Sequence, residues 1–73
     1  MTPTDELKDI TILNIREYPI LKEEILSIYD LAISEIEEGG SPYNEVELAI
    51  RDITEIVANY LSIIKDTQNE QSI

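Results

Sequence analysis

The clearest pattern of apolar positions lies in the second half of the chain. After Ser41, large apolar side chains recur at alternating steps of four and three residues, which is the spacing of one face of an α-helix. These positions are Val46, Ile50, Ile53, Val57, Tyr60 and Ile64. Ala49, Ile56 and Ile63 run beside them at intervals of seven and widen the apolar face. The pattern predicts a helix over about residues 42–66.

The same spacing occurs earlier in the chain. One row of apolar residues consists of Leu21, Ile25, Ile28 and Ala32, and a second row consists of Leu26, Tyr29, Ile33 and Ile36. Pro19 suits the first position of a helix, and Gly39 suits the left-handed residue that ends one. We therefore expect a second helix over about residues 19–38.

The stretch GGSP, residues 39–42, separates the two predicted helices. Ser41 can accept hydrogen bonds at a helix start, and Pro42 needs no backbone donor there. So short a connection makes the two helices antiparallel neighbours. We expect a helical hairpin in which this stretch is a structural turn. The alternative is that the turn also gathers residues of a functional site.

The N-terminal segment allows two interpretations. Thr2, Pro3 and Asp5 are typical of a helix start, and Leu7 and Ile10 continue one face, which predicts a short helix over about residues 3–16. The stretch ITILNI, residues 10–15, could instead form a strand, but the chain offers no second strand to pair with it. We expect one helical domain over residues 1–66 and a disordered tail over residues 67–73.

The fold class is therefore all-α, but each long helix carries more apolar surface than a two-helix contact can cover. A wide apolar face rarely stays exposed on a soluble monomer. The N-terminal helix can cover part of it, and a second copy of the chain can cover the rest as a helical-bundle dimer. We expect a homodimer, with a three-helix monomer and a complex with another protein as alternatives.

Composition narrows the functional classes. The chain has 73 residues, 16 acidic against 5 basic side chains, and a formal charge of −11. Such a charge repels nucleic acid and anionic lipid and favours basic partners. There is no cysteine and no histidine, and no signal peptide or membrane span is evident, so we expect a cytoplasmic protein without a cofactor. For a phage-encoded protein, that location would be the host cytoplasm.

Carboxylates at a spacing of three residues offer one enzyme-like pattern. Glu35 and Glu38 form E-x-x-E, and Asp52 and Glu55 form D-x-x-E on the facing helix. This arrangement resembles the all-α nucleoside triphosphate pyrophosphohydrolases, whose paired motifs E-x-x-E and E-x-x-D hold magnesium, and the resemblance implies a metal-dependent hydrolase. Here the second pair is reversed, Glu38 lies at a helix end, and Asp52 and Glu55 fall outside the apolar face. Solvated acidic faces explain the spacing better.

The hairpin turn offers a different candidate. Tyr43 follows Pro42 directly, and tyrosine is frequent among the residues that dominate binding energies. Polar and acidic residues surround it in sequence, namely Glu37, Glu38, Asn44, Glu45 and Glu47. Our leading hypothesis is a non-catalytic acidic adaptor or inhibitor that binds a basic protein surface, with a phage-type inhibitor or nucleic-acid mimic as a variant. A structural, self-assembling subunit is a further alternative.

Overall fold

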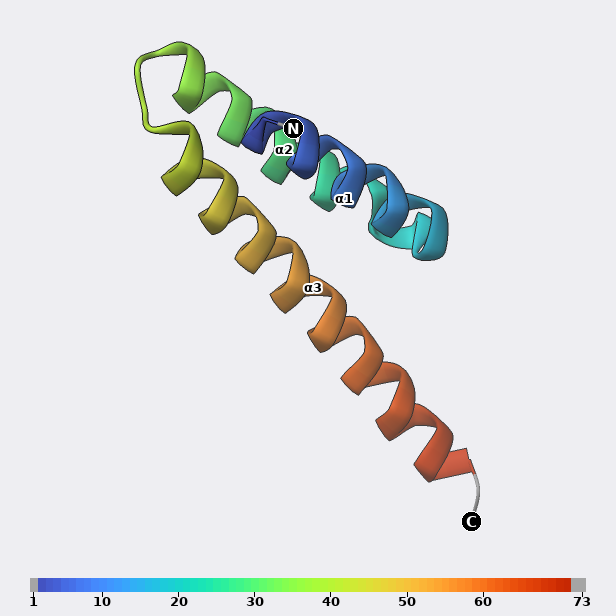
Figure 1. Cartoon of the computed structure of the whole chain (residues 1–73). Helices are drawn as coiled ribbons and strands as arrows, with labels where there is room; N and C mark the ends of the chain where they lie inside the picture. The colour runs from blue at the N-terminus through green and yellow to red at the C-terminus, as the bar shows by residue number, and fades with distance from the viewer. Residues whose placement is uncertain (1, 72–73) are drawn as a thin grey trace.

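The protein is built from three α-helices, as seen in a computed structural model that describes residues 2–71 (Figure 1). Helix α1 spans Pro3–Glu17, α2 spans Lys22–Glu37 and α3 spans Pro42–Gln71. A 3₁₀ turn, η1, spans Pro19–Leu21. Residues 2–71 contain no strand, so the prediction of an all-α protein is confirmed and the strand alternative for residues 10–15 is wrong.

Helix α1 begins and ends at local signals in the sequence. The Thr2 hydroxyl accepts a hydrogen bond from the backbone N–H of Asp5 at 3.2 Å, and Pro3 occupies the first turn. Within the helix, the buried Thr11 hydroxyl donates to the Leu7 carbonyl at 2.7 Å. This bond satisfies the polar atom of Thr11 inside α1 itself. Tyr18 ends the helix immediately before Pro19.

Helix α2 starts three residues later than the sequence pattern predicts. The expected start at Pro19 is occupied by η1, where the Leu21 N–H donates to the Tyr18 carbonyl at 2.9 Å. This tight turn reverses the chain between α1 and α2, and α-helical geometry follows from Lys22. Leu21, which is buried, is therefore held by the turn rather than by the helix.

The end of α2 is a Schellman motif built on two glycines. The Gly39 N–H donates to the Ile36 carbonyl at 3.1 Å, and the Gly40 N–H donates to the Glu35 carbonyl at 2.9 Å. Gly39 has φ of 108°, a conformation that side chains with a Cβ rarely adopt. The two bonds satisfy carbonyl groups at the helix end and turn the chain toward α3.

Helix α3 begins at Pro42, the expected residue, but extends beyond the expected end at residue 66. The chain has no glycine or proline after Pro42, so no residue in this stretch interrupts a helix. The Thr67 hydroxyl donates to the Ile63 carbonyl at 3.0 Å, within the same helix. The expected disordered tail is thus helical through Gln71, while its residues 72–73 lie outside the described part of the chain.

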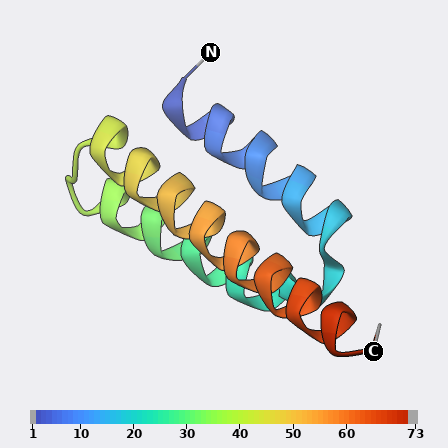
Figure 2. The same cartoon turned by 90° about the horizontal axis from the view of Figure 1, so that it is seen from below.

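The three helices pack against one another around a small core. Helix α2 runs opposite to α1 and α3, and each helix contacts the other two (Figures 1 and 2). Leu7 of α1, Ile25 of α2 and Ile53 of α3 are fully buried, so each helix supplies one central side chain. The remaining buried apolar residues are Leu21, Ala32, Val46 and Ala49.

Helix α3 is about twice as long as its neighbours. At about 1.5 Å per residue its 30 residues span about 45 Å, against about 22–24 Å for α1 and α2. Tyr18, at the end of α1, meets Tyr60 edge to face with ring centres 6.0 Å apart. Beyond this contact, α3 continues past the end of α1 to Gln71, while Ile63 still lines a hollow together with Leu21 and Glu24 (Figure 1). The molecule consequently measures 53 × 19 × 18 Å.

None of the helices within residues 2–71 has the length and apolar character that crossing a bilayer would require.

Candidate protein-interaction surface

The residues expected to form one site at the hairpin turn lie on different sides of the molecule. Tyr43, in the first turn of α3, is 74% exposed and faces α1, and Glu47 lies on the same side. Glu45 is half-buried and faces the groove between α2 and α3. Glu37, Glu38 and Asn44 are exposed. The turn is therefore not a single anchor, because neighbouring helix positions point to opposite faces.

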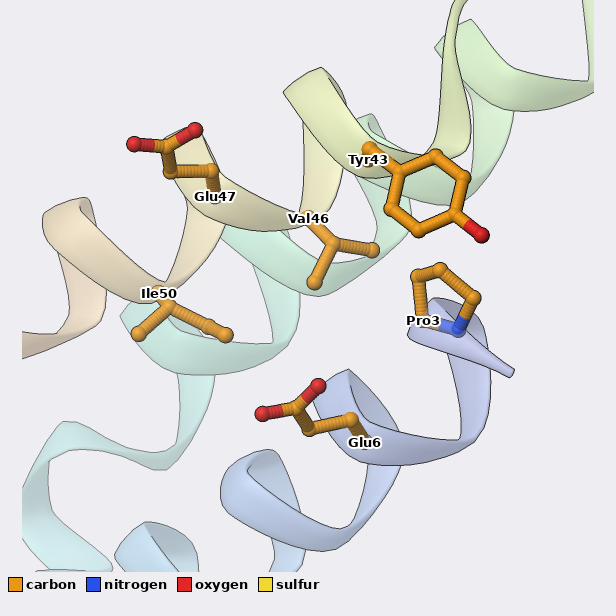
Figure 3. A pocket seen from close by; sticks show the side chains of 6 residues that line it. All are labelled: Pro3, Glu6, Tyr43, Val46, Glu47 and Ile50. Carbon is orange, nitrogen blue, oxygen red and sulfur yellow. The ribbon is translucent and has the colours of Figure 1, made fainter. Parts of the chain in front are cut away.

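A hollow of about 350 Å³ lies beside Tyr43, between α1 and α3. In Figure 3 the tyrosine ring lies over Pro3, while Val46 and Ile50 form the apolar wall. Two carboxylates, from Glu6 and Glu47, also line the hollow. Glu47 is an exposed i,i+4 partner of Arg51, with 3.8 Å between the charged groups, so its charge is partly compensated locally.

A longer groove lies on the opposite side of α3, against α2. It consists of three hollows of about 300, 360 and 210 Å³. The first and second share Ile28 and Asp52, and the second and third share Ile56 and Asn59, so the hollows follow one another along α3. We call this the α2/α3 groove. Its apolar lining includes Ile28, Leu31, Ala32, Leu48, Ala49 and Ile56.

The charged groups along the α2/α3 groove all have the same sign. Five carboxylates line it, from Glu24, Glu35, Glu45, Asp52 and Glu55, and none of its lining residues is a lysine or arginine. Within the described residues, the Arg51–Glu47 pair is the one ion pair, and it lies outside the groove. The groove therefore combines apolar walls with an uncompensated negative charge.

The four acids proposed as metal ligands do not form a cluster. Glu35 and Asp52 line the same hollow, Asp52 and Glu55 line the next, and Glu38 lies at the end of α2. Among the described residues no three acidic side chains lie close enough together to hold a metal ion. Glu38 is the C-cap of α2, which places it beyond the α-helical face that would bring it beside the others.

Carboxylates in this fold are also well solvated. Of the aspartates and glutamates between residues 2 and 67, Glu45 is half-buried and the others are exposed. A carboxyl that acts as a general acid or base near neutral pH is usually tuned by desolvation. In this part of the chain no buried side-chain polar atom lacks a hydrogen-bond partner.

Nine of the ten residues expected to form the core or dimer face belong to the core or pack against it, and Ile64 is the exception. Five are buried, namely Leu21, Ile25, Ala32, Val46 and Ile53. Five are half-buried, namely Ile28, Ile50, Val57, Tyr60 and Ile64. The other apolar row of α2 is half-buried as well, because α1 packs against the hairpin. A three-helix unit thus covers much of the surface that the sequence pattern assigned to a partner.

Sequence reasoning missed the exposed leucines of the α2/α3 groove. Leu31 is 64% exposed and Leu48 is 51% exposed, and both line the same hollow. Each leucine lies outside the apolar stripe of its helix. An apolar residue in that position is expected to be exposed, and this was the one sign of the site that the sequence contains. That the two lie across one groove depends on how α2 packs against α3, and neither helix's pattern contains that information.

Comparison of the chain with protein-family models, curated proteins and solved structures gives no match.

Proposed function

We propose that this chain is a non-catalytic interaction module, a small acidic adaptor or inhibitor that binds a basic protein surface. The observation that carries this proposal is the exposure of large apolar side chains beside uncompensated carboxylates. Leu31 and Leu48 are the clearest examples, since both are more than half exposed in a hollow also lined by three acids. Apolar contact supplies affinity, while complementary charge steers association and selects the partner.

The charge supports a protein partner rather than direct contact with nucleic acid. A formal charge of −11 repels phosphate backbones. The same carboxylates, exposed along helices, can occupy a cationic surface that otherwise holds nucleic acid. Inhibition of a nucleic-acid-binding protein by mimicry is one form that the proposed function can take.

Retention of basic proteins on the immobilised chain tests the proposed function. We expect proteins retained from a cell lysate to be enriched in high isoelectric points and to elute as salt rises, because salt screens exposed charges. Glu45→Lys should reduce retention, and Tyr43→Ala should do so if the partner also reaches the α1/α3 hollow. Mass spectrometry identifies the retained proteins.

Asp9→Lys is the matched control for Glu45→Lys. It changes the net charge by the same amount, and Asp9 is exposed on α1 and lines none of the hollows described above. The proposed function predicts that the control retains more basic protein than Glu45→Lys does. Retention of acidic and basic proteins alike, or retention insensitive to salt, would contradict it.

We also propose that the extension of α3 pairs two copies of the chain. Leu61 is 45% exposed and Ile64 is half-buried, and with Val57 they continue the step of four and three beyond the end of α1. Residues 61–71 contain one lysine, one aspartate and one glutamate, which gives a net charge of −1. Two such segments can approach each other with much less repulsion than the acidic bundle would impose.

Light scattering after size exclusion tests this pairing. The wild type should have the molar mass of a dimer, and Leu61→Glu should be a monomer because two charges would be buried at the contact. Ile12→Glu, at a similarly exposed apolar residue of α1, should leave the dimer intact. A wild-type monomer would contradict the pairing, and an open series of larger assemblies would favour the structural-subunit alternative.

A further inference from the structure

The α2/α3 groove has the dimensions of a binding site for one helix. Its lining runs from Leu48 to Ile63 along α3, which at about 1.5 Å per residue is about 22 Å. A helix of about 15 residues, or four turns, has this length. The groove also has the apolar floor that such a ligand needs. Apolar residues of α3 line all three hollows, with Ile28 of α2 in the first two and Leu21 of η1 in the third.

The exposed apolar residues lie at both ends of the groove. Leu31 and Leu48 line one end, and Ile63, which is 65% exposed, lines the other beside the buried Leu21. Helical ligands of such grooves bind through apolar side chains on one face, spaced at i, i+3, i+4 and i+7. The separation of the exposed positions matches a ligand that places apolar residues in several successive turns.

The charges decide which helix fits. The five carboxylates that line the groove come from both of its helices, with Glu24 and Glu35 on α2 and Glu45, Asp52 and Glu55 on α3. A helix lying between them therefore faces negative charge along both edges. Lysine or arginine beside its apolar face would be complementary, whereas acidic residues there would be repelled.

A second copy of this chain does not meet these requirements. Its own groove is acidic, and its surface carries the same excess of 16 acidic over 5 basic residues. Bringing two such surfaces together would bury like charges against each other, which is strongly unfavourable. The acidic part of the groove, from Glu45 to Glu55 along α3, is therefore distinct from the weakly charged end of α3 through which copies are proposed to pair.

We infer that the α2/α3 groove binds a basic amphipathic helix of a partner protein, about four turns long, through apolar contacts to Leu31 and Leu48 and charge contacts to the flanking acids. This inference rests on the proposed function and names its site and partner class. In an inhibitor, the groove would sequester a basic helical segment that the partner uses elsewhere.

The probe for this inference is a synthetic peptide of about 15 residues that places leucines on one helical face and lysines on the others. Its binding to the wild-type chain is measured by fluorescence anisotropy. A scrambled peptide of the same composition, whose leucines share no face, shows how much binding is due to charge alone. We expect the amphipathic peptide to bind at least about tenfold more tightly than the scrambled one.

Two pairs of substitutions separate the apolar and the charge contributions. Leu31→Gln with Leu48→Gln keeps the net charge, and should weaken binding of the amphipathic peptide by about tenfold or more. Glu35→Gln with Asp52→Asn keeps the apolar walls, and should weaken it while flattening its salt dependence. Both leucines are more than half exposed, so their substitution should leave the fold intact, and circular dichroism of the variants checks this.

Matched controls carry the same substitutions elsewhere on the surface. Ile12→Gln with Leu13→Gln changes two exposed apolar residues of α1, and Glu23→Gln with Asp30→Asn changes two exposed acids of α2 outside the groove. Both controls should bind the amphipathic peptide within about twofold of the wild type. Equal losses in groove and control variants would overturn the inference, and so would equal binding of the scrambled peptide.

The remaining outcomes separate the inference from the proposed function. If neither peptide binds but basic proteins are still retained on the immobilised chain, the groove inference is wrong and the proposed function stands. If neither peptide binds and retention is also insensitive to charge, both are wrong. If Leu31→Gln with Leu48→Gln converts a dimer into a monomer, a second copy occupies the groove and the inference is overturned.

Discussion

Single residues at the hairpin turn determine how α2 meets α3. Gly39 occupies a left-handed conformation with φ of 108°. Gly40 approaches the end of α2 so closely that an added Cβ would lie 2.8 Å from the Glu35 carbonyl oxygen. The first glycine is required for its backbone conformation and the second for the space around it. Both bear on function, because this turn places Glu45 in the α2/α3 groove.

We predict that Gly39→Ala and Gly40→Ala each lower the free energy of unfolding by about 1–2 kcal/mol. The first substitution strains the backbone, and the second forces the turn away from the Glu35 carbonyl. Urea denaturation followed by circular dichroism measures the change. Ser27→Ala, on an exposed face of α2, is the control and should not destabilise the protein, since alanine favours helices. Wild-type stability in both glycine variants would show that the turn can relax.

At the scale of the element, helix α3 has two parts with different surroundings. Up to Tyr60 it packs against α1 and α2, with Val46, Ala49 and Ile53 buried. From Leu61 to Gln71 it continues past the end of α1, and Leu61 and Ile63 are exposed, although Ile63 still lines the α2/α3 groove. Most helical stability in proteins comes from tertiary packing, so the extension depends on intrinsic propensity or on a partner.

Hydrogen exchange should distinguish the two parts of α3. We predict strong protection of backbone amides in residues 46–60 and weaker protection in residues 62–71 at low protein concentration, because this stretch lies past the end of α1 and the lining of the α2/α3 groove ends at Ile63. Raising the concentration should slow exchange in residues 62–71 if two copies pair there. Uniform protection along α3 in dilute solution would contradict the division, and concentration-independent exchange would contradict pairing through the extension.

Much of the element structure could be predicted from the sequence. The apolar stripes and the signals at Thr2, Gly39 and Pro42 led to three helices with nearly correct starts. The errors occurred where local signals compete or are missing. Pro19 is compatible with both a 3₁₀ turn and an α-helix, and the stretch after Lys65 has no residue that stops a helix. Its weakly apolar composition suggested a tail instead.

The site was less predictable than the fold. Sequence proximity grouped Tyr43 with Glu45, yet one faces α1 and the other faces α2. Leu31 and Leu48 were not grouped, yet they line one hollow. A site between helices depends on their relative rotation, which follows from packing of the whole core. Periodicity within one helix does not specify it.

At the scale of the whole molecule, the main feature is the large excess of negative over positive charge. A formal charge of −11 on 73 residues is accompanied, within the described part of the chain, by a single ion pair between exposed side chains. Repulsion among carboxylates therefore opposes folding. The apolar core that stabilises the fold against this repulsion is small, with three fully buried large side chains. A basic partner would relieve this repulsion as it binds, so binding and stability are coupled.

We predict that raising sodium chloride from about 20 mM to about 200 mM raises the Tm, because the Debye length falls below the distances between many of the charges. Differential scanning calorimetry measures the shift. Glu23→Gln with Asp30→Asn removes two exposed charges and should make the shift smaller. A Tm that is independent of salt in the wild type would indicate that carboxylate repulsion contributes little to stability.

The proposed role as an acidic interaction module is tested most directly by nuclear magnetic resonance. Backbone amide shifts of the labelled chain are recorded during titration with the basic amphipathic peptide of about 15 residues. We predict saturable shifts at a ratio of one peptide per chain, concentrated in residues 21–35 and 45–63 on the two sides of the α2/α3 groove. Shifts that spread over all acidic surfaces without saturating would contradict this role, because they would show that the carboxylates only attract positive charge.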